Sequence, residues 1–199
     1  MERTILARHG ESELSCQGLT NGDPRVACPL TQRGRQEARH LGELLVTEPI
    51  DVCVTSEFER ARETADLALD GRDVPRLVLP ELDDIRFGEF EGRALAEYRE
   101  WAHAHAPEDE VPGNGESRVE TIRRYVRGYR TILARPERTI LVIAHGLPIR
   151  YVLDSIAGQI PAAKVEQVPY AEPFPVSAAD LTAAVERLEA WLLDPAWAS

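Results

Sequence analysis

The stretch TILARHGES, residues 4–12, joins a short apolar run to a charged end that contains a glycine. The run from Thr4 to Arg8 is too short for a helix, and its apolar character is typical of a strand buried within a parallel sheet. Similar runs occupy residues 51–55, 76–79 and 139–144. We therefore expect buried strands at all of these positions.

Helical patterns separate the predicted strands. Apolar side chains recur at helical spacing between Thr31 and Val46 and again from Val119 to Leu133, and a last helix is expected over residues 178–193. Alternating strands and helices favour a parallel sheet covered on both sides. The predicted fold class is α/β, a three-layer sandwich whose mainly parallel sheet carries helices on both faces.

Local signals mark where some helices begin. Ser56 with Glu59, and Ser117 with Glu120, both fit the S-x-x-E capping box. Pro148 suits the first turn of a further helix. These residues therefore predict that helices begin just after Ser56, just after Ser117 and near Pro148.

Composition limits the possible partners and the compartment. A length of 199 residues with 43% hydrophobic side chains suits a single domain, residues 1–199, and a formal charge of −11 disfavours nucleic acid. Cys16, Cys28 and Cys53 form no CxxC pair, which favours a reducing compartment. We find no signal-peptide core and no apolar run of ~20 residues, so we expect a cytoplasmic protein without a membrane partner.

Charged side chains follow three of the predicted strands. They lie in Arg8-His9-Gly10, in the segment Ser56–Arg60 and in His145-Gly146. Any one of these could be purely structural, for example a histidine at a strand end or an arginine paired with a nearby glutamate. Ligands of open α/β sheets collect beyond the carboxyl ends of the strands, so together these segments indicate two imidazoles and two guanidiniums around one small anion. Gly10 and Gly146 would allow the backbone to approach it closely.

The ordered motifs RHGES, PLTQRG, SEFERARETA, FGEFEG, GES and AHG resemble those of the histidine phosphatase superfamily, also called the phosphoglycerate mutase-like family. The resemblance extends from residue 4 to about residue 158. It implies that His9 is the nucleophile, forming a phosphohistidine, and that Arg8, Arg60 and His145 hold the phosphoryl group. Fixed cations can stabilise the equatorial oxygens of a phosphoryl group, so neither a metal ion nor a cofactor is expected.

The proton donor is harder to assign because Glu81, Asp83, Asp84 and Glu89 crowd one segment. In the family that this sequence resembles, the acid lies four residues before the first glycine of the FGEFEG-like stretch. That glycine is Gly88 here, so the resemblance indicates Asp84 as the proton donor.

Candidate substrate contacts lie near the nucleophile. Ser12 is a possible donor to a phosphate oxygen, and Ser15 stands where the family often has Asn. Asn21 and Gly22, within a loop that is longer than usual in the family, are the alternative contacts to the leaving group.

Residues 90–117 form a possible lid region. Within it, the Pro- and Gly-rich segment 106–115 is expected to be an exposed loop, either a lid edge or a plain connector. His103 and His105 lack a convincing metal-ligand set. Residues 168–176 contain three prolines and are expected to cross the surface before the last helix.

The pattern favours a metal-independent phosphatase acting on a small-molecule phosphate ester. One alternative is phosphoglycerate mutase-type transfer, but the mutases resembled here carry a longer insertion rich in Lys and Arg, which this chain lacks between Gly92 and Gly115. Another alternative is a catalytically silent phosphate-binding module. The residues define the phosphoryl group but neither the leaving alcohol nor the oligomeric state.

Overall fold

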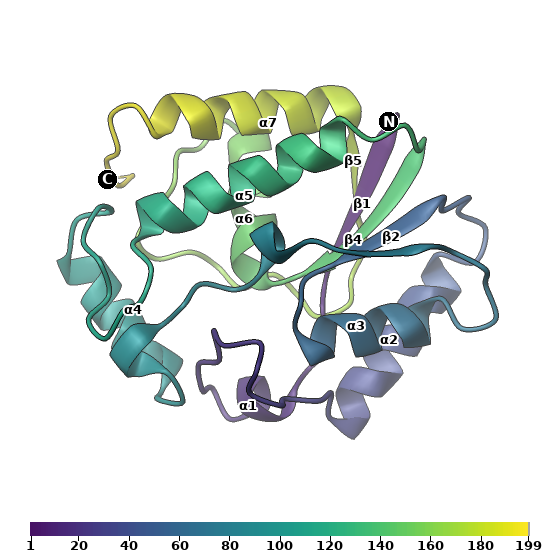
Figure 1. Ribbon diagram of the computed structural model, residues 1–199, viewed down its shortest axis with the longest axis horizontal. Coiled ribbons are helices and arrows are strands. Elements are labelled where there is room, and N and C mark those ends of the chain that lie inside the picture. The colour runs from purple at the N-terminus through teal and green to yellow at the C-terminus, as the bar shows by residue number, and fades with distance from the viewer. Residues whose placement is uncertain (199) are drawn as a thin grey trace.

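Five strands form a single sheet in the order β3-β2-β4-β1-β5. The computed structural model describes residues 1–198 and is shown as a ribbon in Figure 1. The strands are β1 (Arg3–Arg8), β2 (Val52–Thr55), β3 (Arg76–Val78), β4 (Thr139–Ala144) and β5 (Phe174–Ser177).

The central strands are parallel and in a register that aligns their carboxyl ends. Arg8 of β1 is paired with Ala144 of β4, and Thr55 of β2 with Ile143 of β4. The segments that follow these residues therefore leave the sheet side by side. Within residues 1–198, only β5 runs antiparallel, against the outer side of β1.

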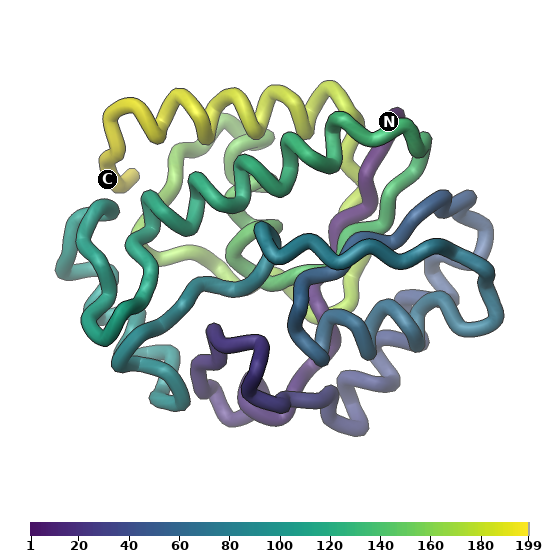
Figure 2. The backbone as a smooth tube through the Cα atoms, viewed as in Figure 1, coloured from purple at the N-terminus to yellow at the C-terminus, as the bar shows by residue number. Residues whose placement is uncertain are grey.

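Helices cover both faces, and the alternation of side chains along the strands decides which face each residue joins. One face packs against α2 (Gln32–Leu44) and α3 (Glu59–Ala68), with Ile5 and Ile143 in the apolar cluster between them. The opposite face packs against α5 (Arg118–Leu133), α6 (Gly146–Ile156) and α7 (Ala178–Trp191). The tube in Figure 2 shows the two helical layers on either side of the strands. The predicted three-layer α/β fold is confirmed.

The remaining helices are short and lie beyond the carboxyl edge of the sheet or beside it. They are α1 (Glu13–Cys16), the 3₁₀ turns η1 (Pro80–Leu82) and η2 (Gly88–Phe90), and α4 (Leu95–Ala104). None of the helices in residues 1–198 is long and apolar enough to cross a membrane.

Helix capping follows the sequence signals at Ser117 but not at Ser56. Ser117 caps α5 with the predicted reciprocal bonds to Glu120. The prediction for Ser56 was wrong, because α3 begins at Glu59 with Phe58 as its N-cap residue and no side-chain cap. The Ser56 hydroxyl is instead bonded to a buried histidine, His145.

Two strand predictions also need correction. The strand at β3 is mostly exposed rather than buried, because β3 is an edge strand with β2 as its one neighbour. Residues 168–176 do not simply cross the surface, since β5 begins at Phe174 and pairs with β1. Pro175 cannot donate a backbone hydrogen bond, but an edge strand tolerates this loss.

Part of the segment expected to be an exposed loop is buried. Val111 joins an apolar cluster with Phe87, Phe90 and Tyr98, and the Glu89 amide donates to the Pro112 carbonyl oxygen over 2.7 Å. The loop therefore folds back onto the η2 turn and completes a packed wall together with α4.

A close contact between two glycines seats the loop that follows β1. A Cβ atom on Gly34 of α2 would overlap the Glu11 carbonyl oxygen, and one on Gly10 would overlap the Gly34 carbonyl oxygen. Only residues without a side chain allow the helix and the loop to approach so closely.

We predict that Gly34→Ala lowers the free energy of unfolding by about 2 kcal/mol, because overpacking outweighs the better helix propensity of alanine. Urea unfolding measures this change. Gln36→Ala, at an exposed position of the same helix, is the control and should change stability little. A Gly34→Ala variant more stable than the wild type would contradict the close contact.

Candidate active site

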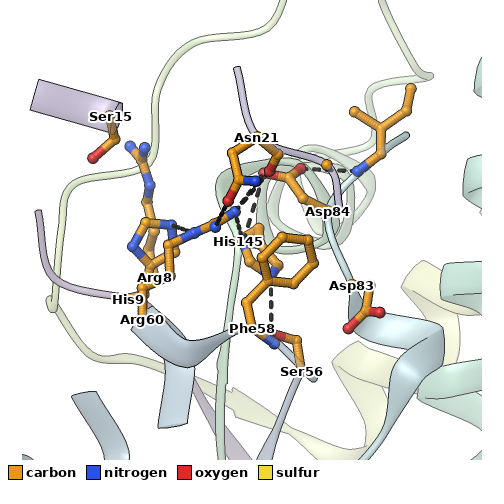
Figure 3. A network of polar contacts seen from close by, with 12 residues as sticks. Arg8, His9, Ser15, Asn21, Ser56, Phe58, Arg60, Asp83, Asp84 and His145 are labelled. Atoms are coloured by element: carbon orange, nitrogen blue, oxygen red, sulfur yellow. Dashed lines mark hydrogen bonds and ion pairs between the residues drawn. The ribbon is translucent and has the colours of Figure 1, made fainter. Parts of the chain in front are cut away.

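A cavity of about 490 Å³ opens beyond the carboxyl ends of the central strands. Its lining includes Arg8, His9, Arg60, Asp84 and Gly146, which come from four separate segments of the chain. Figure 3 shows the polar contacts that join most of these side chains. The structure thus brings the sequence-predicted strand-end residues to one site.

His9 is buried, with one ring nitrogen fixed and the other facing Arg60. Its Nδ1 lies 2.7 Å from the Gly10 carbonyl oxygen, which can only accept, so Nδ1 carries the proton. Its Nε2 accepts a hydrogen bond from Arg60 Nε over 3.1 Å. Burial, and secondarily the charges of Arg60 and Arg8, lower the pKa of His9 well below its ordinary value. The imidazole is therefore neutral with its lone pair on Nε2.

Arg60 connects the two histidines to the loop that contains Asn21. Besides His9 Nε2, it donates to the backbone oxygen of Asn21 over 3.1 Å and contacts the Asn21 side-chain oxygen. Its Nη2 also lies 3.3 Å from His145 Nδ1. Arg60 lies in the first turn of α3, so the fold holds a buried guanidinium beside His9.

His145 occupies the N-cap position of α6 and is completely buried. Its Nε2 is 2.9 Å from the Ser56 hydroxyl, and the Phe58 ring packs edge-on at 4.7 Å between ring centroids. Burial is the main reason that its pKa lies well below the ordinary value, with Arg60 as the next cause. Its Nδ1 faces Arg60 and Asp84 (Figure 3).

Arg8 is held by the segment before β5. Its Nη1 donates to Gln167 Oε1 over 2.6 Å and to the Val168 carbonyl oxygen over 2.8 Å, and its guanidinium lies 3.9 Å from the centre of the Tyr170 ring. Its Nε is buried without a partner among the described residues. An unpaired buried N–H is costly, and it is well suited to receive an oxygen from a ligand in the cavity.

Asp84 is the one member of the four candidate acids that lines the cavity. Its Oδ2 lies 3.6 Å from both Arg60 Nη2 and His145 Nδ1. Burial raises the pKa of Asp84, although Arg60 and the Ile85 amide act in the opposite direction. A carboxyl group with a raised pKa can carry a proton near neutral pH and give it to a departing oxygen.

The neighbouring carboxylates have other surroundings. Asp83 accepts a hydrogen bond from the Glu57 amide over 2.8 Å, and burial raises its pKa to about 7. Glu81 and Glu89 do not line the cavity.

Arg124 of α5 fixes the backbone on which Asp84 stands. It donates to the carbonyl oxygens of Asp83 and Asp84 over 2.8 and 3.0 Å. The Glu116 carboxylate binds the same guanidinium through both oxygens, at 2.9 and 2.7 Å. Because this pairing is bidentate and largely buried, it restrains the position of Asp84 through its main chain.

Three of the four expected substrate contacts line the cavity, and one does not. Ser12 and Asn21 line the cavity, with the Ser12 hydroxyl 3.0 Å from that of Ser15. Gly146 lines it beside Arg8. Gly22 does not line it, and its amide donates to Glu91 over 2.8 Å.

Within residues 1–198, no group of three or more His, Cys, Asp and Glu side chains is arranged to hold a metal ion. This covers His103 and His105, whose nearby acidic residues do not complete a ligand set.

Comparison with known proteins identifies the family. Residues 4–193 match the histidine phosphatase superfamily, branch 1. The chain belongs to this superfamily. The resemblance predicted from the ordered motifs is therefore confirmed.

Relatives within the superfamily include phosphatases and mutases. An adenosylcobalamin/alpha-ribazole phosphatase of Salmonella typhimurium is 37% identical over 72% of this chain and 73% of its own length. A 2,3-bisphosphoglycerate-dependent phosphoglycerate mutase 2 of Gloeobacter violaceus is 34% identical over 77% and 74%. The crystal structure of the alpha-ribazole phosphatase from Shigella flexneri has a TM-score of 0.74 at 28% identity, over 87% and 89% of the two chains. These comparisons confirm the expected phosphoric monoester hydrolase class.

Sequence reasoning missed several residues of this histidine phosphatase site. Ser56 was assigned to helix capping, although its position directly after β2 was a signal for the site. Gln167 and Tyr170 contact Arg8 from a segment that carries no motif. Arg118, which follows the GES motif, also lines the cavity and was not singled out.

Proposed function

We propose that this protein hydrolyses phosphate monoesters through a phosphohistidine formed on His9, without a metal ion. The observation that carries the proposal is the neutral imidazole of His9, which lines the cavity and whose Nε2 lone pair faces the buried guanidinium of Arg60. A neutral imidazole nitrogen with a fixed lone pair is a competent nucleophile toward phosphorus.

In the first step, His9 Nε2 forms a bond to phosphorus while the bond from phosphorus to the ester oxygen breaks. The electron pair of that bond leaves with the oxygen, and the Asp84 carboxyl group gives the oxygen its proton. Water then attacks phosphorus in the phosphohistidine, and the bond from phosphorus to Nε2 breaks with its electron pair returning to the ring nitrogen. The Asp84 carboxylate takes a proton from this water, and inorganic phosphate is released. The cycle restores His9 and the acid.

Arg8, Arg60 and His145 are proposed to hold the phosphoryl oxygens. The support for Arg8 is its unpartnered Nε, and the support for Arg60 is its position between the two histidines. Positive groups fixed before the reaction stabilise the transferring group without reorganising. Ser12, Asn21 and Gly146 line the same cavity and are proposed substrate contacts.

Hydrolysis is favoured over mutase transfer mainly by the sequence, because the Lys- and Arg-rich insertion expected of mutases is missing. The phosphatase relative reported above is also somewhat more similar, 37% identical against 34% for the mutase. We infer that the substrate is a small-molecule ester with a partly apolar alcohol, because Leu19, Phe87 and Leu147 also line the cavity.

The domain organisation and the location of the protein in the cell are also proposals. We propose that the chain acts as one catalytic domain, with region 90–117 as a cover that contributes Leu95 and Tyr98 to the cavity. All three cysteines are unpaired, which supports a reducing, cytoplasmic location.

We predict that His9→Ala abolishes phosphate release from phenyl phosphate, because no other neutral imidazole nitrogen occupies this position. The matched control is His40→Ala, at an exposed position of α2 that pairs with Glu43. Initial rates with the purified variants test this. Turnover by His9→Ala near the wild-type rate would remove His9 from the mechanism.

A second prediction concerns the proton from Asp84. An alkoxide needs that proton to leave and a nitrophenolate does not, so Asp84→Asn should slow phosphorylation by alkyl phosphates by ~10² or more and by nitrophenyl phosphate much less. The acid acts only while protonated. The alkyl phosphate rate should therefore fall as pH rises through the raised pKa of Asp84, and Asp84→Asn should lose that dependence.

Single-turnover measurements are needed, because Asp84 is also proposed to activate water in the second step. Asp83→Asn is the control, since Asp83 does not line the cavity. Equal losses for the two leaving groups would reject Asp84 as the acid.

A further inference from the structure

Arg118 is a buried cation in the cavity wall with no role in the steps above. It is the first residue of α5 and only 5% exposed. Its Nε donates to the Tyr98 hydroxyl over 2.7 Å and its Nη1 to the Tyr151 hydroxyl over 2.5 Å. Its Nη2 makes only a long contact, 3.4 Å, with the Ala163 carbonyl oxygen. The guanidinium therefore has N–H groups left for a ligand.

The charge of Arg118 has no counter-ion. No carboxylate of residues 1–198 lies within ion-pair distance of it. Burial raises the pKa values of Tyr98 and Tyr151, so both hydroxyls stay neutral. Buried charges are normally paired, because removing an ion from water is costly. Asp84 lies near Arg60, and Glu116 pairs with Arg124, but none of the described carboxylates stands beside Arg118 in this way.

Arg99 of α4 adds a second positive charge to the same wall. It is half-buried, lines the cavity and has no hydrogen bond or ion pair within the described part of the chain. Burial, and next the charge of Arg118, lower the pKa of Arg99. Figure 1 shows α4 and the start of α5 on one side of the view and α3, which carries Arg60, on the other.

The charge within the cavity is opposite to that of the whole protein. The chain carries −11, yet four arginines line the cavity against two carboxylates, Asp84 and Glu166. Asp84 has a raised pKa, and Glu166 is exposed to solvent. A phosphate at His9 accounts for Arg8 and Arg60 only.

We propose that Arg118 and Arg99 form a second anion subsite, which binds an acidic group, a carboxylate or a further phosphate, on the alcohol part of the substrate. This inference rests on the proposed function, because it assumes that the phosphoryl group lies at His9. The substrate is then a phosphate monoester with two anionic ends and an apolar part between them, facing side chains such as Phe87 and Leu147.

Binding of non-hydrolysable ligands tests the subsite without requiring turnover. The probes are ω-carboxyalkyl phosphonates of increasing chain length, each compared with its ω-carboxamide by calorimetry. At the chain length that spans the cavity, the carboxylate should bind the wild type about tenfold more tightly or better, as expected for a charge-assisted hydrogen bond. Equal dissociation constants at every length would overturn the subsite.

Variants assign the preference to the two arginines. Arg99→Gln and Arg118→Met should each reduce the carboxylate preference toward unity, and Arg118→Lys should retain part of it. Arg93→Gln is the matched control, because Arg93 is exposed near α4 and pairs with Glu97 outside the cavity. Arg99 is only half-buried, so Arg99→Gln keeps the test decisive if Arg118→Met does not fold. A preference unchanged in Arg99→Gln and Arg118→Lys would contradict the proposal.

Hydrolysis of phenyl phosphate, which has no second acidic group, tests the proposed function separately. Turnover without any carboxylate preference would overturn the subsite and leave the phosphatase function intact. A carboxylate preference without turnover would support the subsite and overturn hydrolysis.

Discussion

The hydrogen bond from His9 Nδ1 to the Gly10 carbonyl oxygen decides which ring nitrogen carries the proton and which keeps its lone pair. With the proton held on Nδ1, the lone pair stays on Nε2, and Arg60 fixes the direction of that nitrogen. The loop itself is held on both sides. The Gly10 amide donates to Thr64 of α3 over 3.0 Å, and the backbone of Gly34 in α2 packs directly against the loop. Backbone contacts thus fix both the loop and the orientation of the His9 ring.

The sheet positions the two histidines, and α5 positions Asp84. Parallel register brings the ends of β1 and β4 together, so that His9 and His145 lie with ring centroids 5.3 Å apart. Asp84 belongs to a segment outside the sheet, and Arg124 of α5 holds it there through main-chain oxygens. The same burial has opposite effects on these groups: it keeps the imidazoles neutral and favours the protonated carboxyl group. Burial thus acts on the proposed nucleophile and on the proposed acid alike.

Much of this arrangement could be predicted because its signals are local. The buried run 139–144 matches β4, and the S-x-x-E pattern at Ser117 matches its cap. The same pattern failed at Ser56, where a long-range bond to His145 takes the hydroxyl, and no local rule contains that bond. The strand β5 was missed because Pro175 argues against a strand unless the edge position is known. Likewise, the missing counter-ion of Arg118 depends on which carboxylates the fold brings close.

The central claim is that Nε2 of His9 attacks phosphorus, and the position of the phosphoryl group on the ring tests it most directly. The phosphoenzyme can be trapped by rapid denaturation in base, where phosphohistidine survives, and the isomer identified by mass spectrometry and phosphorus NMR of the isolated peptide. The structure predicts phosphorylation of His9 at Nε2, since Nδ1 is occupied by the Gly10 carbonyl oxygen. Phosphate on Nδ1, or on any residue other than His9, would contradict the account.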